Sequence, residues 1–232
     1  NPIYNGNVAA PLSLSGGITR FPEDQTTFSQ LMKASLATIA SVREAGGDSI
    51  LSLSKSSHAA LNRKSVVEKR LLQALDQKNL HVLYQPQLDV KTGKINAVEA
   101  LVRWDDEEIG VVSPDELIPI AEETGLINNI GSFMLERACE QAVAWKNAGH
   151  QIKVSINSSV REFRDKNMAK SILETLDRTG CPADLLQIEI TEKFALEAEA
   201  ETGIIKQMRI LENEGILFSL DDFGTGYGSF RY

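Results

Sequence analysis

The sequence lacks the features that would place it in a membrane or on a nucleic acid. Its 232 residues contain no run of roughly 18 apolar side chains and no basic, apolar leader, so we expect neither a membrane span nor a secretory signal. Acidic residues outnumber basic ones by 32 to 24, which argues against a nucleic-acid polymer as partner, because phosphate neutralisation needs clustered Lys and Arg. We therefore expect a cytoplasmic segment without membrane contact of its own, whatever membrane or sensor segment precedes it.

Cysteine is scarce as well. The two cysteines, Cys139 and Cys181, lie in separate segments without metal-ligand spacing, so we interpret them as reduced thiols with no assigned function. Hydrophobic residues make up 42% of the chain, enough for one large domain or for one domain plus a fragment. Because the chain begins at Asn1 rather than at Met, and ends at Tyr232 just after a glycine-rich run, we expect it to be part of a longer protein.

From about residue 81 the hydrophobic pattern alternates between strands and helices. We expect strands at 81–84, 95–104, 153–157, 186–190 and 216–221, and helices at 114–124, 131–148, 168–179 and 203–214. Ser113 begins a capping box at the first helix, and a glycine follows each helix. Helices between short strands require parallel strands with right-handed crossovers, so the pattern predicts an α/β fold, either a doubly wound sheet or a (β/α) barrel.

The first 50 residues do not follow this pattern. They indicate one strand at 12–19 and one helix at 27–45. Residues 51–65 are polar and serine-rich, which is typical of a linker, and a helix at 66–77 then leads into the first strand of the main domain. We therefore predict a fragment of one domain at 1–50, a linker at 51–65 and a second domain from 66 to 232.

Three oxygen-bearing residues lie near the ends of successive strands of the main domain: Asn157, Glu189 and Asp221. Each is separated from the next by 32 residues, one strand-helix unit. In a (β/α) barrel these strand ends meet on one rim, where active sites of that fold are found. Glu99, in an apolar strand, is a fourth candidate. Carboxylates and an amide without His or Cys favour Mg²⁺ or Mn²⁺ over Zn²⁺.

Simpler roles remain open for each residue alone. An acid at a strand end usually caps the next helix or pairs with an Arg, and Arg103 is a possible partner for Glu99. Glu192 is either an acid at a helix N-terminus or an anchor for the glycine-rich loop 223–228. The four candidates together favour a metal site, and Asp222 beside Asp221 would serve a second ion. Two such ions can activate a water and stabilise the leaving oxygen of a phosphodiester.

These residues belong to a series of motifs that resembles the EAL-domain phosphodiesterases over 66–232. The motifs are Tyr-Gln-Pro at 84–86, Glu-Ala-Leu-Val-Arg-Trp at 99–104, Ser-Pro-Asp-Glu-Leu-Ile-Pro at 113–119, Ala-Glu-Glu-Thr-Gly-Leu-Ile at 121–127, Ser-Ile-Asn at 155–157, Glu-Ile-Thr-Glu at 189–192 and Asp-Asp-Phe-Gly-Thr-Gly-Tyr at 221–227. The resemblance implies a (β/α) TIM-like barrel, incomplete at its C-terminus, that hydrolyses cyclic-di-GMP (c-di-GMP) to linear pGpG in bacterial signalling.

The resemblance also implies a role for each matched residue. The metal ligands would be Glu99, Asn157, Glu189, Asp221 and Asp222, the last for a second Mg²⁺ or Mn²⁺. Arg103 would grip a phosphate of c-di-GMP, while Gln85 and Leu101 line the ligand. Glu192 would hold the loop 222–228, which links the site to the contacts of a homodimer, so that the catalytic set is Glu99, Asp221, Asp222 and Glu192. The family's catalytic lysine and its later acidic and Gln positions would lie beyond Tyr232.

The N-terminal segment resembles the last strand and helix of a GGDEF domain. The matching stretches are residues 12–18, residues 21–24 and the end of the helix at 45–47. Ser35, Ile39 and Val42 replace the Asp, Tyr and Lys that are usual on that helix. We therefore expect the α+β tail of a degenerate, regulatory GGDEF domain and assign it no cyclase activity.

Two other functions are compatible with parts of this pattern. One is a catalytically inactive c-di-GMP receptor or scaffold, which would retain the ligand site without the catalytic lysine. The other is Mg²⁺-assisted enolisation, a chemistry that also places acids on successive barrel strands. Arg103 and the Asp-Asp-Phe-Gly sequence at 221–224 argue against the second.

Overall fold

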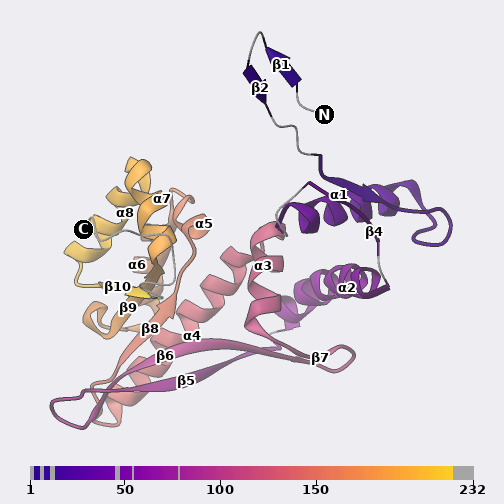
Figure 1. Cartoon of the computed structure of the whole chain (residues 1–232). Coiled ribbons are helices and arrows are strands. Elements are labelled where there is room, and N and C mark those ends of the chain that lie inside the picture. The colour runs from indigo at the N-terminus through magenta and orange to yellow at the C-terminus, as the bar shows by residue number, and fades with distance from the viewer. Residues whose placement is uncertain are drawn as a thin grey trace. The chain divides into compact units, whose positions relative to one another are not determined.

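The computed structural model of the protein describes residues 3–5, 8–10, 14–44, 48–53, 55–77 and 79–221 (Figure 1). Its contacts divide the chain into two compact units, Asn1–Val66 and Val67–Tyr232. The second unit starts within one residue of the position predicted for the second domain. Asp222 and the loop 223–228 lie outside the described residues.

The N-terminal unit is built around helix α1 (Phe28–Glu44), which agrees with the predicted helix to within one residue at each end. This helix packs on two parallel strands, β3 (Gly16–Ile18) and β4 (Ile50–Ser52). A separate antiparallel pair is formed by β1 (Ile3–Asn5) and β2 (Val8–Ala10). The strand predicted at 12–19 is therefore shorter, with residues 12 and 13 outside the described part, and the assignment to a GGDEF domain stays a prediction.

Helix α2 (Lys55–Gln77) corrects the prediction for residues 51–65. Most of that stretch, expected to be a linker, is helical, and the helix begins eleven residues before the predicted start at 66. The part within the second unit is held by Val67, Leu71 and Ala74, which are buried at helical spacing. The N-terminal turns of α2 were not predicted because they are rich in serine, whose hydroxyl competes for backbone hydrogen bonds and lowers helix propensity.

The second unit contains a six-stranded sheet in the order β10-β9-β8-β6-β5, with β7 paired to β6 (Figure 1). The strands are β5 (Leu80–Leu88), β6 (Ile95–Asp106), β7 (Gly110–Val112), β8 (Lys153–Asn157), β9 (Leu186–Thr191) and β10 (Leu217–Asp221). Strands β6, β8, β9 and β10 are parallel, as the helical crossovers predict. Among the described residues this is an open α/β sheet, and its closure into a (β/α) barrel stays a prediction.

Strand β5 is antiparallel to β6 because only a short turn joins them. Asp89 stabilises that turn by accepting hydrogen bonds from the backbone N–H groups of Lys91 and Thr92, at 2.8 and 2.9 Å. Gly93 has φ = 67°, a left-handed conformation that glycine adopts without strain. The sequence predicted both strands, although β5 and β6 continue four and two residues further than expected.

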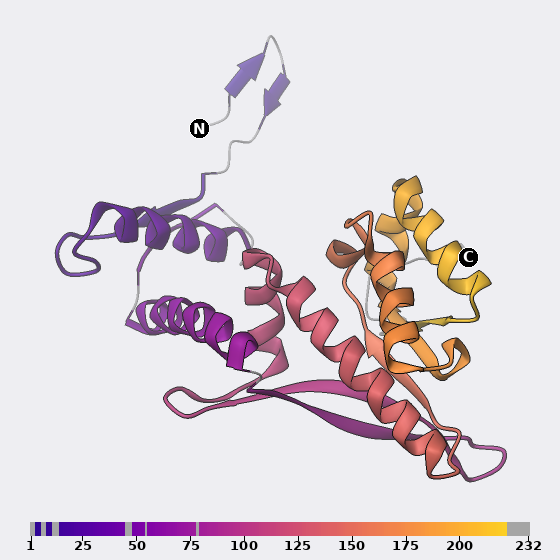
Figure 2. The same cartoon turned by 180° about the vertical axis from the view of Figure 1, so that it is seen from behind.

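In the part of the chain that the structure describes, six helices follow β7: α3 (Pro114–Thr124), α4 (Ile127–Asn147), α5 (Val160–Phe163), α6 (Met168–Thr179), α7 (Glu192–Ala200) and α8 (Thr202–Asn213), with a 3₁₀ turn η1 (Ala183–Leu185). The predicted bounds of α3 and α6 are confirmed, and α4 begins four residues earlier than expected. Figure 2 shows α4 lying along the sheet, where it contacts β6 and β8 and also packs against α6. The short α5, which begins after two residues that follow β8, was not predicted, and α7, directly after β9, was indicated only by the interpretation of Glu192 as an acid at a helix N-terminus.

Alternation along β6 divides its side chains between two faces of the sheet. Val98, Ala100, Val102 and Trp104 are buried in the core, whereas the intervening residues from Glu99 to Arg103 are only half buried. Tyr84 of β5 reaches the helical side, where its ring packs edge-on against Trp145 of α4 at 5.2 Å. Glu99, Leu101 and Arg103 therefore lie on the face of β6 opposite to that of the buried Val98, Ala100 and Val102.

The two cysteines, separate in the sequence, are neighbours in the core. Cys139 of α4 and Cys181 after α6 are both buried. A hydrogen bond with Cys181, together with burial, raises the pKa of the Cys139 thiol. Both thiols thus contribute to the packing of α4 against α6.

Among the described residues, no helix is long and apolar enough to cross a membrane.

Candidate metal centre

Three carboxylates converge on the part of the sheet formed by β6, β8, β9 and β10, in which β8 lies between β6 and β9. Glu99, Glu189 and Asp221 each offer one oxygen, and these atoms all lie within 4.8 Å of one another. The parallel pairing explains the convergence, because Glu189 of β9 is level with Ser219 of β10, two residues before Asp221. The structure therefore brings together three residues that are separated by up to 122 positions in the sequence.

Asn157, the last residue of β8, completes the cluster. It is level with Glu189 in the parallel pairing, and its Nδ2 donates a hydrogen bond of 2.7 Å to Oε1 of Glu99. This bond orients the amide so that its oxygen, rather than its nitrogen, is the group suited to a cation. All four residues that the sequence singled out as rim ligands lie within one site.

The surroundings of Glu189 disfavour its ionised form. Its side chain is 7% exposed, and burial raises its pKa, with the negative charges of Glu99 and Asp221 adding to the rise. Hydrogen bonds from Ser155 and Gln87 oppose the shift, the latter at 3.5 Å from Nε2 to Oε1. Like charges gathered at a partly buried position favour a bound cation, which would stabilise all three carboxylates in their ionised form.

Gln87 and Ser155 are site residues that the sequence analysis missed. Gln87 follows Gln85 by two positions on β5, so both amides lie on the same face, and this alternation was a usable signal. Ser155 is level with Glu99 in the pairing of β6 and β8. Ser155 is small and lies between apolar residues in the sequence, a pattern typical of a core strand, and it is 1% exposed in the structure.

The residues predicted to contact a substrate lie next to the cluster. Gln85 is directly across the β5–β6 pair from Glu99, while Leu101 and Arg103 follow Glu99 by two and four positions on the same face of β6. Leu101, Arg103 and Asn157 line one cavity of about 170 Å³. Leu101 and Arg103 are thus grouped with Asn157 of the cluster, and residues of α3 and α4 form much of the remaining cavity wall.

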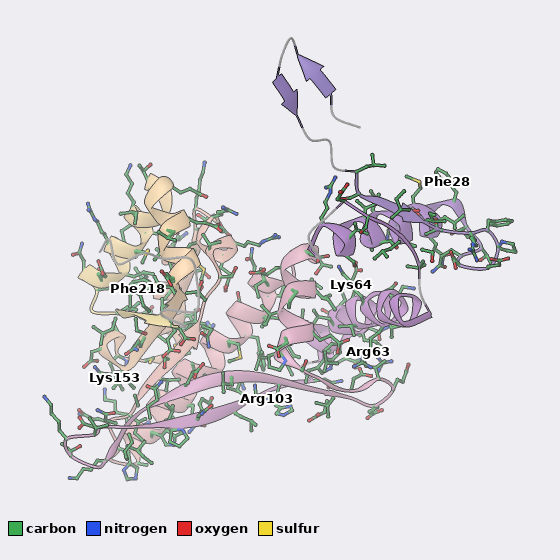
Figure 3. The ribbon with its side chains drawn as sticks, in the orientation of Figure 1. Phe28, Arg63, Lys64, Arg103, Lys153 and Phe218 are labelled. Atoms are coloured by element: carbon green, nitrogen blue, oxygen red, sulfur yellow. The ribbon has the colours of Figure 1, made fainter. Side chains whose placement is uncertain are left out.

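Arg103 does not neutralise Glu99. It lies on the β6 ribbon in Figure 3, and its Nη1 donates a hydrogen bond of 2.8 Å to the carbonyl of Val102. Within the described part of the chain no ion pair joins Arg103 to Glu99. The alternative in which Glu99 is only the partner of Arg103 is therefore not supported.

Glu192 is the first residue of α7, as expected of an acid at a helix N-terminus. The preceding Thr191 caps the helix by accepting a hydrogen bond of 3.2 Å from the Phe194 N–H. One oxygen of Glu192, Oε2, is buried and has no hydrogen-bond partner among the described residues. The loop 222–228, its other predicted partner, lies outside those residues, as does Asp222.

The donor set is that of a hard divalent cation. Carboxylate oxygens and an amide oxygen suit Mg²⁺ or Mn²⁺, and no His or Cys is present in the cluster to favour Zn²⁺. The raised pKa of Glu189 and the close carboxylates fit such an ion, because a cation would offset the repulsion among them. A larger cavity of about 440 Å³ adjoins Asn157 and Thr191, with Arg161 and Arg164 in its wall.

Comparison with known families gives one match, to the EAL domain, over residues 68–232. This range covers the second unit except for its first residue, and it includes every candidate site residue.

Individual relatives extend the similarity into the N-terminal unit. The oxygen sensor protein DosP of Escherichia coli is 32% identical over 97% of this chain and 28% of its own length. The bifunctional diguanylate cyclase/cyclic di-GMP phosphodiesterase MucR of Pseudomonas aeruginosa is 32% identical over 95% of this chain and 32% of its own length. The chain thus spans about three-tenths of these relatives.

Among solved structures, the c-di-GMP complex of the PaMucR phosphodiesterase superposes with a TM-score of 0.65 at 36% sequence identity. The superposition covers 71% of this chain and 66% of that one. The sheet and helices of the second unit therefore have the arrangement of that fold.

Proposed function

Because the chain belongs to the EAL-domain family of c-di-GMP phosphodiesterases, we propose that it hydrolyses c-di-GMP to linear pGpG with Mg²⁺ or Mn²⁺. The observation that carries the proposal is the cluster of Glu99, Glu189 and Asp221, with Asn157 bonded to Glu99. The reaction would serve bacterial second-messenger signalling in the cytoplasm.

Each site residue has a defined task in this proposal. Glu99, Asn157, Glu189 and Asp221 hold the first ion, and Asp222 contributes to a second. Bound ions of this kind supply an activated water and stabilise the leaving oxygen of the phosphodiester.

The remaining side chains act on the dinucleotide and on the loop. Arg103 holds a phosphate, which its planar guanidinium can bind through two parallel hydrogen bonds. Gln85 and Leu101 line the ligand on the same face of the sheet. The buried oxygen of Glu192 that lacks a partner in the described residues would anchor the loop 222–228, through which the site communicates with a homodimer contact.

The test is hydrolysis by the purified full-length protein with Mn²⁺ and c-di-GMP, followed by chromatography of the products. We expect pGpG from the wild type and none from Glu99→Gln, because the substitution removes a charged ligand while keeping its volume. Glu107→Gln, in the exposed turn after β6, changes the charge equally away from the site and should leave turnover unchanged. Tight binding of c-di-GMP without any turnover by the wild type would reject hydrolysis and indicate a receptor or scaffold.

We also propose that the N-terminal unit is the end of a degenerate GGDEF domain. The family match begins only at residue 68, whereas the similarity to MucR, which is named as a diguanylate cyclase as well, covers 95% of this chain and so includes most of the N-terminal unit. The expected role is regulatory. Formation of c-di-GMP from GTP by the full-length protein would contradict a degenerate domain.

A further inference from the structure

A buried acid outside the metal cluster lies directly behind the segment that follows Asn157. Glu162, in the first turn of α5, is 4% exposed. Its Oε2 accepts a hydrogen bond of 2.7 Å from the Ser159 backbone N–H and one of 3.2 Å from the Ser158 hydroxyl. These two serines are the residues immediately after Asn157, so the carboxyl holds the chain where β8 ends.

The other side of the same carboxyl rests on α4. A Cβ added to Gly131 would overlap Oε1 of Glu162 and lie 3.0 Å from its Cδ. Gly131 is an internal residue of α4, where glycine is otherwise unfavourable. The missing side chain is explained by the carboxyl, which occupies its place and is wedged between α4 and the segment Ser158–Ser159.

The neighbouring charged groups fix the same segment from other elements. Glu122 of α3 accepts a hydrogen bond of 2.6 Å from the Ser159 hydroxyl, and its backbone carbonyl accepts one of 2.6 Å from Nη1 of Arg161. The Ser158 N–H donates to the Glu189 carbonyl at 3.0 Å. Burial raises the pKa of Glu162 to about 7, and the charge of Glu122 adds to the rise.

We propose that Glu162 is a positioning residue that holds Asn157 for cation binding by locking Ser158 and Ser159 against α4. This inference rests on the proposed function, since it concerns the same metal site. Asn157 is the last residue of β8, so the position of its amide depends on the backbone that follows it as well as on the hydrogen bond to Glu99. Glu162 contacts that backbone, and no hydrogen bond or ion pair joins it to the carboxylates of the cluster within the described residues.

The test measures the affinity of the full-length protein for Mn²⁺ by isothermal titration calorimetry. Loss of groups that support metal ligands typically weakens metal affinity by about ten- to a hundredfold, and we expect Glu162→Ala to raise the Kd by about tenfold. Glu162→Gln keeps an acceptor oxygen for both serines and should retain most of the affinity. Glu201→Gln is the matched control, because Glu201 binds Arg164 at the other end of α5 and not the serines.

Gly131→Ala tests the same contact of Glu162 from the side of α4. In the wild-type background it should weaken Mn²⁺ binding as Glu162→Ala does, because the new methyl group displaces the carboxyl. In the Glu162→Ala background it should have little further effect, since the space is then vacant, and this non-additivity identifies the pair. Gly131→Ala also tests the role of the Glu162 carboxyl without removing Glu162 itself.

The proposal is overturned if Glu162→Ala binds Mn²⁺ as tightly as the wild type, if Glu162→Gln loses as much as Glu162→Ala, or if the two substitutions add. A role restricted to capping α5 would lower thermal stability and leave the Kd unchanged. The outcome is separable from hydrolysis. A wild type that binds Mn²⁺ but does not cleave c-di-GMP would refute the phosphodiesterase proposal, while the Kd values would still decide the role of Glu162.

Discussion

Replacing Glu162 by Gln should change how the stability of the second unit depends on pH. The pKa of Glu162 is about 7 in the folded protein, against an ordinary value of 4.5. The folded state therefore keeps a proton over a range in which the unfolded chain has already released it. Stability from this group is fully present below about pH 4.5 and is lost as the pH rises through about 7.

The size of the effect follows from these two pKa values. Between about pH 5 and about pH 8, linkage predicts a loss of about 2 to 3 kcal/mol in the free energy of unfolding of the wild type. Glu162→Gln cannot titrate and loses none of this. Other carboxyl groups, including those of the metal cluster, titrate in both proteins, so the difference between the two pH profiles isolates Glu162.

The assay is urea unfolding in the presence of a chelator, at a series of pH values. Tryptophan fluorescence reports on the second unit, because Trp104 and Trp145, the two tryptophans of the chain, both lie in it. We expect the curves of wild type and Glu162→Gln to diverge as the pH rises above about 5, with the variant relatively more stable. Parallel profiles, or a wild type that gains relative stability with pH, would refute the reasoning.

Three further outcomes test other parts of the structure. Addition of Mn²⁺ should raise the melting temperature of the wild type but not that of Asp221→Asn, and an equal rise in both proteins would exclude Asp221 as a ligand. Without metal, Asp221→Asn should be no less stable than the wild type, because the charge of Asp221 contributes to the raised pKa of Glu189. Ser113→Ala removes the N-terminal cap of α3 and should cost about 1 kcal/mol in urea unfolding; an unchanged midpoint would contradict the cap. Phe163→Ala should cost roughly 3 to 5 kcal/mol, since this 1% exposed ring packs edge-on against two other phenylalanines; a loss below about 1 kcal/mol would show that the cluster is not part of the core.

Local signals were enough for much of the secondary structure. The bounds of α3 and α6 were predicted because caps and left-handed glycines mark helix ends within a few residues of sequence. The strand β8 was predicted at its observed bounds for a similar reason, since it is a short apolar run between turns. By contrast, no change of periodicity indicates the short helices α5 and α7, and only Glu192 marked a helix N-terminus at the start of α7.

Composition alone gave a wrong prediction for the start of α2. The serine-rich start of α2 has the composition of a linker, yet the segment is helical from Lys55. The register of the sheet likewise depends on contacts between residues that are distant in the sequence. Regular spacing predicted that Asn157, Glu189 and Asp221 share a rim, but only the pairing of β6 with β8 places Glu99 within reach of Asn157.

The amino-acid sequence by itself determined the alternation of strands and helices, the choice of oxygen donors and the EAL family, because each is encoded in short motifs and their spacing. The tertiary structure decided which side chains share an environment. The contact of Glu162 with Gly131 joins residues 31 positions apart, and neither residue alone indicates it. A pKa, a vacant Cβ position or a shared ligand depends on atoms that approach in space, and that proximity exists only after the sheet and α4 have packed together.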